Sequence, residues 1–137
     1  MSEFSPADAL SHFEQPTSPK RILCVENKRE TCKLIQDALR GYDVIAVQSL
    51  DDAREYYRKH KFSLILLDGC LADGDGVAFC EEIRTRDFLT PVIFITNDPN
   101  LSEVHIRIAG AQKLLRKQSP EFIPELKKLT NGLSVRR

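Results

Sequence analysis

Five short strand-like runs alternate with segments of helical periodicity from residue 21 onward, and this alternation constrains the fold more than any other feature. The runs cover residues 22–25, 44–47, 64–67, 92–95 and 113–116. The third and fourth runs are continuously apolar, which is typical of strands that helices cover on both faces. Because the connections are short, the pattern predicts an α/β fold with a doubly wound parallel sheet.

Five helices are predicted between and after these strands. They are expected at residues 29–40, through Tyr56 and Tyr57, at 77–86, at 101–109 and from about 120 to 129. Gly41 ends the first of them, and Ser49 with Asp52 forms a capping box before the second. Gly132 follows the last helix, so we expect that helix to end near Leu129.

The length of 137 residues corresponds to one domain. We expect a flexible leader at 1–19, a domain at 20–131 and a tail at 132–137, with no room for an effector domain. The charges balance at 20 basic and 20 acidic residues, which argues against broad binding to nucleic acid or anionic membrane. No apolar run suits a membrane span or a secretory signal, so our expectation is a cytoplasmic protein.

The four cysteines are Cys24, Cys32, Cys70 and Cys80, and none of them forms a CxxC pair or a zinc-like spacing. We interpret them mostly as small buried hydrophobic residues. Unpaired cysteines of this kind suit a reducing compartment.

Polar residues stand where the predicted strands end. They are Glu26 and Asn27 after the first strand, Asp68 after the third, Thr96 after the fourth and Lys117 after the fifth. In an open parallel sheet these ends meet at one edge, where sites form. The set suits phosphoryl chemistry, because an aspartate can form an acyl phosphate and magnesium prefers carboxylate oxygens. The alternative is that each polar residue merely ends its strand.

On these residues the sequence resembles the receiver domain of two-component response regulators, over about residues 20–131. The matching segments are ILCVEN at 22–27, LLDGCLADGDG at 66–76, PVIFIT at 91–96, and Gly110-Ala111 with Lys117 seven residues after the glycine. The resemblance implies a flavodoxin-like fold with a five-stranded parallel sheet in the order 2-1-3-4-5 and five helices. It also implies phosphotransfer from a histidine kinase or a phosphotransfer protein.

The resemblance implies a role for each matching residue. Asp68 corresponds to the phosphoacceptor, Thr96 to the switch hydroxyl and Lys117 to the lysine that pairs with the phosphoryl group. Glu26 corresponds to the first member of an acidic pair that helps to hold Mg²⁺, and the backbone carbonyl of Cys70 to a further metal ligand.

Among the positions that depart from the family pattern, two bear most directly on function. Asn27 stands where the family usually has a metal-binding aspartate, so the predicted metal ligands are Glu26, Asn27, Asp68 and the Cys70 carbonyl, and we expect weak Mg²⁺ binding. Leu114 stands where the family usually has a switch tyrosine or phenylalanine. The aromatic side chain that responds to phosphorylation is then absent.

Two functions therefore remain open. The first is a single-domain receiver that is phosphorylated on Asp68 and signals by binding a partner through the fourth helix, fifth strand and fifth helix. We expect it to be no enzyme in its own right beyond self-catalysed phosphotransfer and dephosphorylation, and a homodimer is compatible with the sequence. Val104 and Leu114 are candidates for exposed apolar residues on that face, and the alternative is that they pack in the core. The second function is a pseudo-receiver that binds proteins without phosphorylation.

Overall fold

The computed structural model describes residues 20–135, so the leader predicted at 1–19 lies outside the described residues. At its centre is a parallel sheet of five strands. These are β1 (Arg21–Val25), β2 (Asp43–Val47), β3 (Leu64–Asp68), β6 (Val92–Thr96) and β7 (Lys113–Arg116). Their order is β2-β1-β3-β6-β7, and every neighbouring pair is parallel. The predicted flavodoxin-like order is therefore confirmed.

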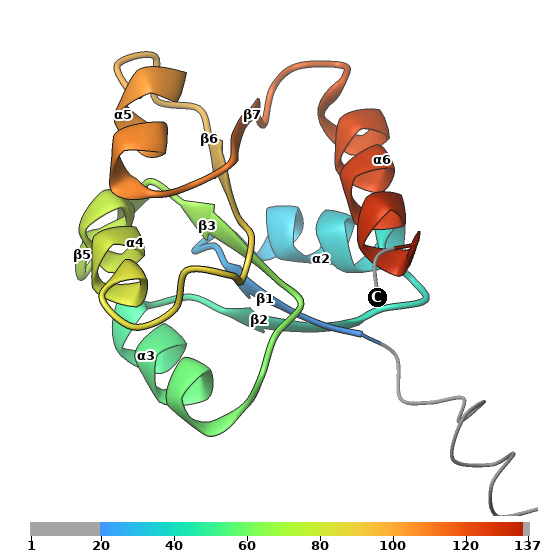
Figure 1. Ribbon diagram of the computed structural model, residues 1–137. Coiled ribbons are helices and arrows are strands. Elements are labelled where there is room, and N and C mark those ends of the chain that lie inside the picture. The colour runs from blue at the N-terminus through green and yellow to red at the C-terminus, as the bar shows by residue number, and fades with distance from the viewer. Residues whose placement is uncertain (1–19, 136–137) are drawn as a thin grey trace, which may run out of the picture.

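Helices cover both faces of this sheet, with α3, α4 and α5 on one side and α2 and α6 on the other (Figure 1). Their bounds are α2 (Arg29–Ala38), α3 (Leu50–Lys59), α4 (Gly76–Arg84), α5 (Glu103–Ala109) and α6 (Phe122–Val135). Each strand leads into a helix that packs back on the sheet, as in other doubly wound folds. This arrangement leaves the carboxyl ends of the strands together at one edge.

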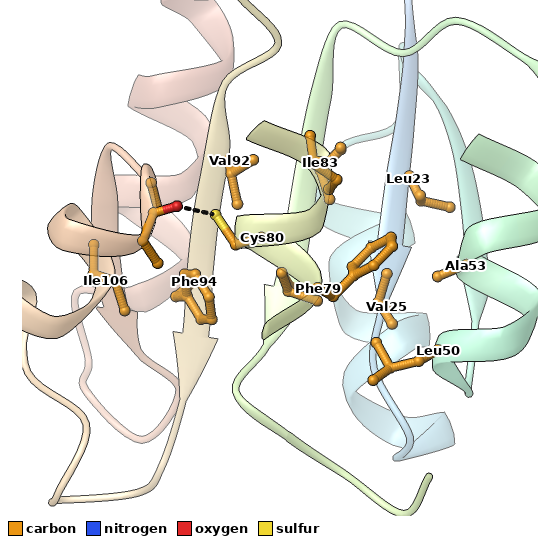
Figure 2. Close-up of a cluster of buried hydrophobic side chains, with 14 of the residues drawn as sticks. Leu23, Val25, Leu50, Ala53, Phe79, Cys80, Ile83, Val92, Phe94 and Ile106 are labelled. Carbon is orange, nitrogen blue, oxygen red and sulfur yellow. Dashed lines mark hydrogen bonds between the residues drawn. The ribbon is translucent and has the colours of Figure 1, made fainter. Parts of the chain in front are cut away.

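Two hydrophobic cores explain why the central strands are apolar throughout. Leu23 and Val25 of β1 point toward the helices α3, α4 and α5, whereas Ile22 and Cys24 of the same strand pack with α2 and α6. Successive strand residues face opposite sides, so a strand covered on both faces needs apolar residues at every position. Figure 2 shows the first core, where Phe79 lies against Val25 and Leu50.

The last helix is longer than the sequence predicts. It was expected to end near Leu129, but α6 continues through Gly132 to Val135. Leu133 is 8% exposed and packs in the second core, and the Tyr42 hydroxyl donates to the Thr130 carbonyl at 2.8 Å. Burial of this extra turn outweighs the low helix propensity of a single glycine.

A short hairpin follows β3, where the sequence predicts only a loop. Its strands are β4 (Cys70–Leu71) and β5 (Gly74–Asp75). The Asp73 carboxylate, between them, accepts the backbone N–H groups of Leu50 and Asp51 at 2.9 and 3.1 Å. The hairpin is thereby tied to the first turn of α3, whose predicted cap is also present because Ser49 Oγ accepts the Asp52 N–H.

All four cysteines are free thiols, and three of them are buried as expected, whereas Cys70 is exposed. Figure 2 shows the buried Cys80 donating to a backbone carbonyl, that of Ala109, at 3.4 Å. None of the helices among residues 20–135 has the length and apolar character needed to cross a bilayer.

Candidate functional site

Four of the predicted site residues come together at the carboxyl edge of the sheet. Glu26 follows β1, Asp68 ends β3, Thr96 ends β6 and Lys117 follows β7. Glu26 is 0%, Asp68 5% and Thr96 1% exposed, and the Lys117 side chain is 9% exposed. Burial of charged side chains is costly unless they are paired, so their contacts decide what this edge can do.

Lys117 joins the two carboxylates. Its Nζ donates to Glu26 Oε1 at 2.8 Å and to Asp68 Oδ2 at 3.3 Å. Burial alone would lower the pKa of the Lys117 ammonium, but the hydrogen bond that it donates to Glu26 and the negative charges of Asp68 and Glu26 outweigh burial and raise that pKa. With both carboxylates ionised, one ammonium faces two negative charges, which leaves room for further positive charge.

The remaining carboxylate oxygens accept backbone N–H groups. Glu26 Oε2 accepts from Lys28 at 3.0 Å, and Asp68 Oδ1 accepts from Cys70 at 3.3 Å. Both contacts of Asp68 are therefore longer than those of Glu26, and 3.3 Å is at the long end of hydrogen-bond distances. Of the two carboxylates, Asp68 is the one held more loosely.

Thr96 connects the ends of two strands. Its Oγ1 accepts the Asp98 N–H at 2.9 Å, and its carbonyl accepts the Lys117 N–H at 3.0 Å. A threonine hydroxyl that accepts one hydrogen bond still has its own proton to donate. Thr96 can therefore present a donor at this edge while its lone pair holds the loop after β6.

A glycine accounts for the close approach of the loop after β3 to Asp68. A Cβ atom at Gly76 would collide with the backbone carbonyl of Asp68. The Gly76 N–H also donates to the Gly69 carbonyl at 3.2 Å, which closes the hairpin beside the carboxylate. The glycine that ends the matching segment at 66–76 thus has a steric reason.

Two other positions singled out in the sequence do not belong to this buried group of site residues. Asn27 is exposed, and its side chain makes no hydrogen bond within residues 20–135. Leu114, a candidate for an exposed residue of a partner face, is 9% exposed and packs in the first core, so that candidate role is wrong and the alternative of core packing is confirmed. Alternation along β7 turns Leu114 toward α5. Val104 is 66% exposed, as expected.

The donor set at this edge fits a hard cation. Among residues 20–135, no three His, Cys, Asp or Glu side chains gather as a metal site. Mg²⁺, however, is bound through one or two carboxylates and keeps several waters. Glu26 and Asp68 supply two carboxylates that share only one ammonium, and the Asn27 amide and the Cys70 carbonyl are further oxygens. The residues present fit Mg²⁺ in charge and in ligand type.

Some residues of this edge were not identified from the sequence. Arg116, one residue before Lys117, donates through its guanidinium to the carbonyls of Asp98 and Leu101 in the loop after β6. Cys32 of α2 donates through its thiol to the Glu26 carbonyl at 3.3 Å. Arg116 could have been noticed in the sequence as a basic residue beside the candidate site lysine. Nothing in the sequence indicates that the Cys32 thiol binds the Glu26 carbonyl.

Comparisons with known proteins agree with this geometry. The family described as "Response regulator receiver domain" matches residues 22–128. The nisin biosynthesis regulatory protein NisR of Lactococcus lactis subsp. lactis is 35% identical over 78 residues, which are 56% of this chain and 34% of NisR. The chain thus spans about a third of that curated relative.

Solved structures have the same fold. The BeF3-activated N-terminal receiver domain of Klebsiella pneumoniae RstA is 27% identical with a TM-score of 0.74, over 83% of this chain and 98% of that domain. The signal receiver domain of a Luxo repressor protein from Vibrio parahaemolyticus is also 27% identical with a TM-score of 0.74, over 84% of this chain and 89% of that one.

Proposed function

Because the chain belongs to the response regulator receiver domain family, we propose that it accepts a phosphoryl group on the carboxylate of Asp68. The donor would be a phosphohistidine of a histidine kinase or a phosphotransfer protein. The observation that carries this proposal is the Lys117 ammonium, 3.3 Å from Asp68 and 2.8 Å from Glu26 in a site where both carboxylates are buried. A fixed cation beside a buried aspartate is suited to stabilising transferred phosphoryl oxygens.

In the proposed reaction an Asp68 oxygen attacks the phosphorus, and the bond from phosphorus to the donor nitrogen breaks. The electron pair of that bond stays on the imidazole of the donor, so no oxidant or reductant takes part. The long contacts of Asp68 support this role, since little has to be broken before the oxygen attacks. Lys117 would pair with the phosphoryl oxygens, and the Thr96 hydroxyl would donate its proton to one of them.

Receiver domains typically bind Mg²⁺, and here Glu26, Asp68, the Asn27 amide oxygen and the Cys70 backbone carbonyl would hold it. When bound, the ion supplies positive charge that neutralises the transferred group. An amide at position 27 brings no charge, and we therefore propose that Mg²⁺ binds weakly.

The proposed output is a changed affinity for a partner at the surface of α5, β7 and α6. Val104 and Ile108 of α5 are 66% and 78% exposed, and they lie four residues apart, hence on one side of the helix. Two exposed apolar side chains on one helix face support protein binding there. A second copy of this chain is one candidate partner.

The alternative function is a pseudo-receiver that binds its partner without phosphorylation. The exposed amide at Asn27 and the buried Leu114 favour it, because one weakens the metal site and the other removes the usual switch aromatic. Under this alternative, partner affinity would be the same for the wild type and for Asp68→Ala.

The test of phosphorylation is the intact mass of the protein after incubation with acetyl phosphate and Mg²⁺. We expect the wild type to gain the mass of one phosphoryl group, Asp68→Ala to gain none, and Asp51→Ala, at an exposed aspartate of α3, to behave as the wild type. Because small donors react inefficiently with some receivers, a beryllofluoride titration with Mg²⁺ accompanies it. An adduct that persists in Asp68→Ala, or a wild type that neither forms the adduct nor binds beryllofluoride, would overturn the proposal.

A further inference from the structure

Arg116 holds the loop that follows the candidate switch threonine. From the end of β7 its guanidinium reaches across to residues 97–102, where Nη1 donates to the Asp98 carbonyl and Nη2 to the Leu101 carbonyl. The planar guanidinium makes both bonds at once, which the ammonium of a lysine does much less well. Both acceptors belong to one short loop between β6 and α5, so Arg116 joins β7 to the start of α5.

The same loop is hydrogen-bonded to Thr96. The Asp98 N–H donates to Thr96 Oγ1 at 2.9 Å, and the Leu101 N–H donates to the Asp98 carbonyl at 3.2 Å. The Asp98 carbonyl therefore accepts from both Arg116 and Leu101. Asp98 is therefore bound by Thr96 through its N–H and by Arg116 through its carbonyl. A movement of the Thr96 hydroxyl toward Asp68 would have to displace Asp98 against the bond from Arg116.

The loop also touches the segment next to the phosphoacceptor candidate. A Cβ atom at Gly69, the residue after Asp68, would lie 2.6 Å from Leu101 Cδ2 and 3.9 Å from Thr96 Oγ1. The Leu101 side chain therefore packs over the backbone beside Asp68, while its carbonyl is bound by Arg116. A change at Asp68 can therefore reach the loop in two ways, through Leu101 of the loop itself and through Thr96, which is hydrogen-bonded to Asp98.

We propose that Arg116 is a positioning residue that keeps the 97–102 loop in its resting conformation, and so sets how readily Thr96 and Leu101 respond when Asp68 is modified. This inference rests on the proposed phosphorylation of Asp68. Leu114, on the same strand, is buried in the first core and takes no part in this role. The side chain of β7 that contacts the loop is Arg116, and release of its two bonds favours the responding conformation.

The test compares Arg116→Met with Arg116→Lys and with Arg107→Met, a control that removes an arginine from α5 whose side chain is 62% exposed. In the first measurement, amide hydrogen exchange is followed in the unmodified proteins. We expect Arg116→Met to lose roughly tenfold protection at the Asp98 and Leu101 amides, because a hydrogen bond from a charged donor is of that strength. The Lys variant should lie between, and Arg107→Met should match the wild type.

In the second measurement, ¹⁵N-labelled proteins are titrated with beryllofluoride and Mg²⁺ by NMR. We expect roughly tenfold tighter binding by Arg116→Met, since the resting conformation no longer competes. A merely structural role would weaken binding or leave it unchanged, and either result overturns the inference, as does unchanged exchange in the loop. If the wild type neither formed the phosphoryl adduct nor bound beryllofluoride, the phosphoacceptor proposal would fail, and the exchange measurement alone would decide whether Arg116 holds the loop.

Discussion

Lys117 and Glu26, 91 residues apart in the sequence, form the shorter of the two ion pairs that Lys117 makes at the carboxyl edge, with Nζ 2.8 Å from Oε1. The contact from Lys117 to Asp68 is 3.3 Å. The lysine is therefore anchored by Glu26 and placed beside Asp68. Glu26 has two roles in this arrangement, since its carboxylate orients the Lys117 ammonium and is also a proposed ligand of Mg²⁺.

Replacement of Lys117 by methionine should destabilise the fold. Two buried carboxylates would then face each other without a cation, and removing one partner of a buried ion pair costs about 3–5 kcal/mol. Lys113→Met is the matched control on β7, because its side chain is 39% exposed and its ion pair with Glu103 is long at 3.9 Å; about 0–1 kcal/mol is expected there. Urea unfolding at neutral pH measures both, and equal losses in the two variants would contradict the anchoring role.

The pH dependence of the Lys117 contribution has a definite sign. Because the folded pKa is raised, the contribution is fully present below the ordinary lysine pKa of 10.5 and is lost only as the pH rises through the higher folded value. The difference in unfolding free energy between the wild type and Lys117→Met should stay constant from neutral pH to 10 and shrink above it. A difference that shrinks already between pH 7 and 9 would mean that the pKa is not raised.

Substitution of Asn27 by aspartate should strengthen Mg²⁺ binding. A third carboxylate adds negative charge at the proposed metal site, and we expect about tenfold tighter binding, or about 1.4 kcal/mol. Asn97→Asp is the control, because it adds the same charge directly after Thr96 at a position not proposed as a ligand. Calorimetric titration with Mg²⁺ should show the gain for Asn27→Asp alone; equal gains would indicate a general charge effect.

Two glycine-to-alanine substitutions should act in opposite directions. At Gly76 the new Cβ would collide with the Asp68 carbonyl, and a forced shift of packed backbone costs about 1–3 kcal/mol. At Gly132, inside α6, a Cβ meets nothing within 4 Å, so alanine should stabilise the helix by about 0.5–1 kcal/mol. Thermal unfolding of both variants tests this, and a destabilising Gly132→Ala would contradict the extension of α6.

The Tyr57–Asp87 pair should stabilise the fold over a defined pH range. The Tyr57 hydroxyl donates to Asp87 Oδ2 at 2.8 Å, and burial together with this bond raises the pKa of Tyr57 to about 12. Burial would raise the pKa of Asp87, but hydrogen bonds from Thr90, Tyr57 and Leu89 outweigh it and hold that pKa below its ordinary value of 3.8. By linkage the aspartate contribution is present above 3.8 and lost as the pH falls below it, whereas the tyrosine contribution is present below pH 10.0 and lost on approach to 12.

A double-mutant cycle of Tyr57→Phe and Asp87→Asn measures this pair. We expect a coupling of about 1–2 kcal/mol at pH 7, because one partner is charged and the pair is half-buried. Tyr56→Phe is the control, since the Tyr56 side chain is exposed and stacks on the His60 ring. A coupling energy that is absent at pH 7, or that does not decrease at low pH, would argue against the hydrogen bond between Tyr57 and Asp87.

Much of the architecture was predictable from the sequence because its causes are local. The apolar run at 64–67 is typical of a strand covered on both faces, and Leu64–Asp68 is indeed such a buried strand; the polar residue at each strand end marks the edge where a site forms. The Ser49 cap of α3 is likewise a matter of neighbours in sequence. The sequence therefore predicts the fold class and, through the family resemblance, the strand order. It also predicts that four side chains gather at one edge, those of Glu26, Asp68, Thr96 and Lys117.

The tertiary structure decided what depends on contacts between distant segments. Whether Leu114 is exposed or buried depends on which face of β7 meets α5, and whether α6 passes Gly132 depends on the core that receives Leu133. The hydrogen bonds between Asp73 and the start of α3 and between Arg116 and the 97–102 loop likewise join residues that are distant in the sequence, so local patterns do not predict these contacts. The sequence alone determined which chemical groups stand at the ends of the strands, through local periodicity. Only packing decided their distances, because the 2.8 Å bond between residues 26 and 117 forms only once β3 and β6 have assembled between β1 and β7 and the ends of these two strands lie at the same edge of the sheet.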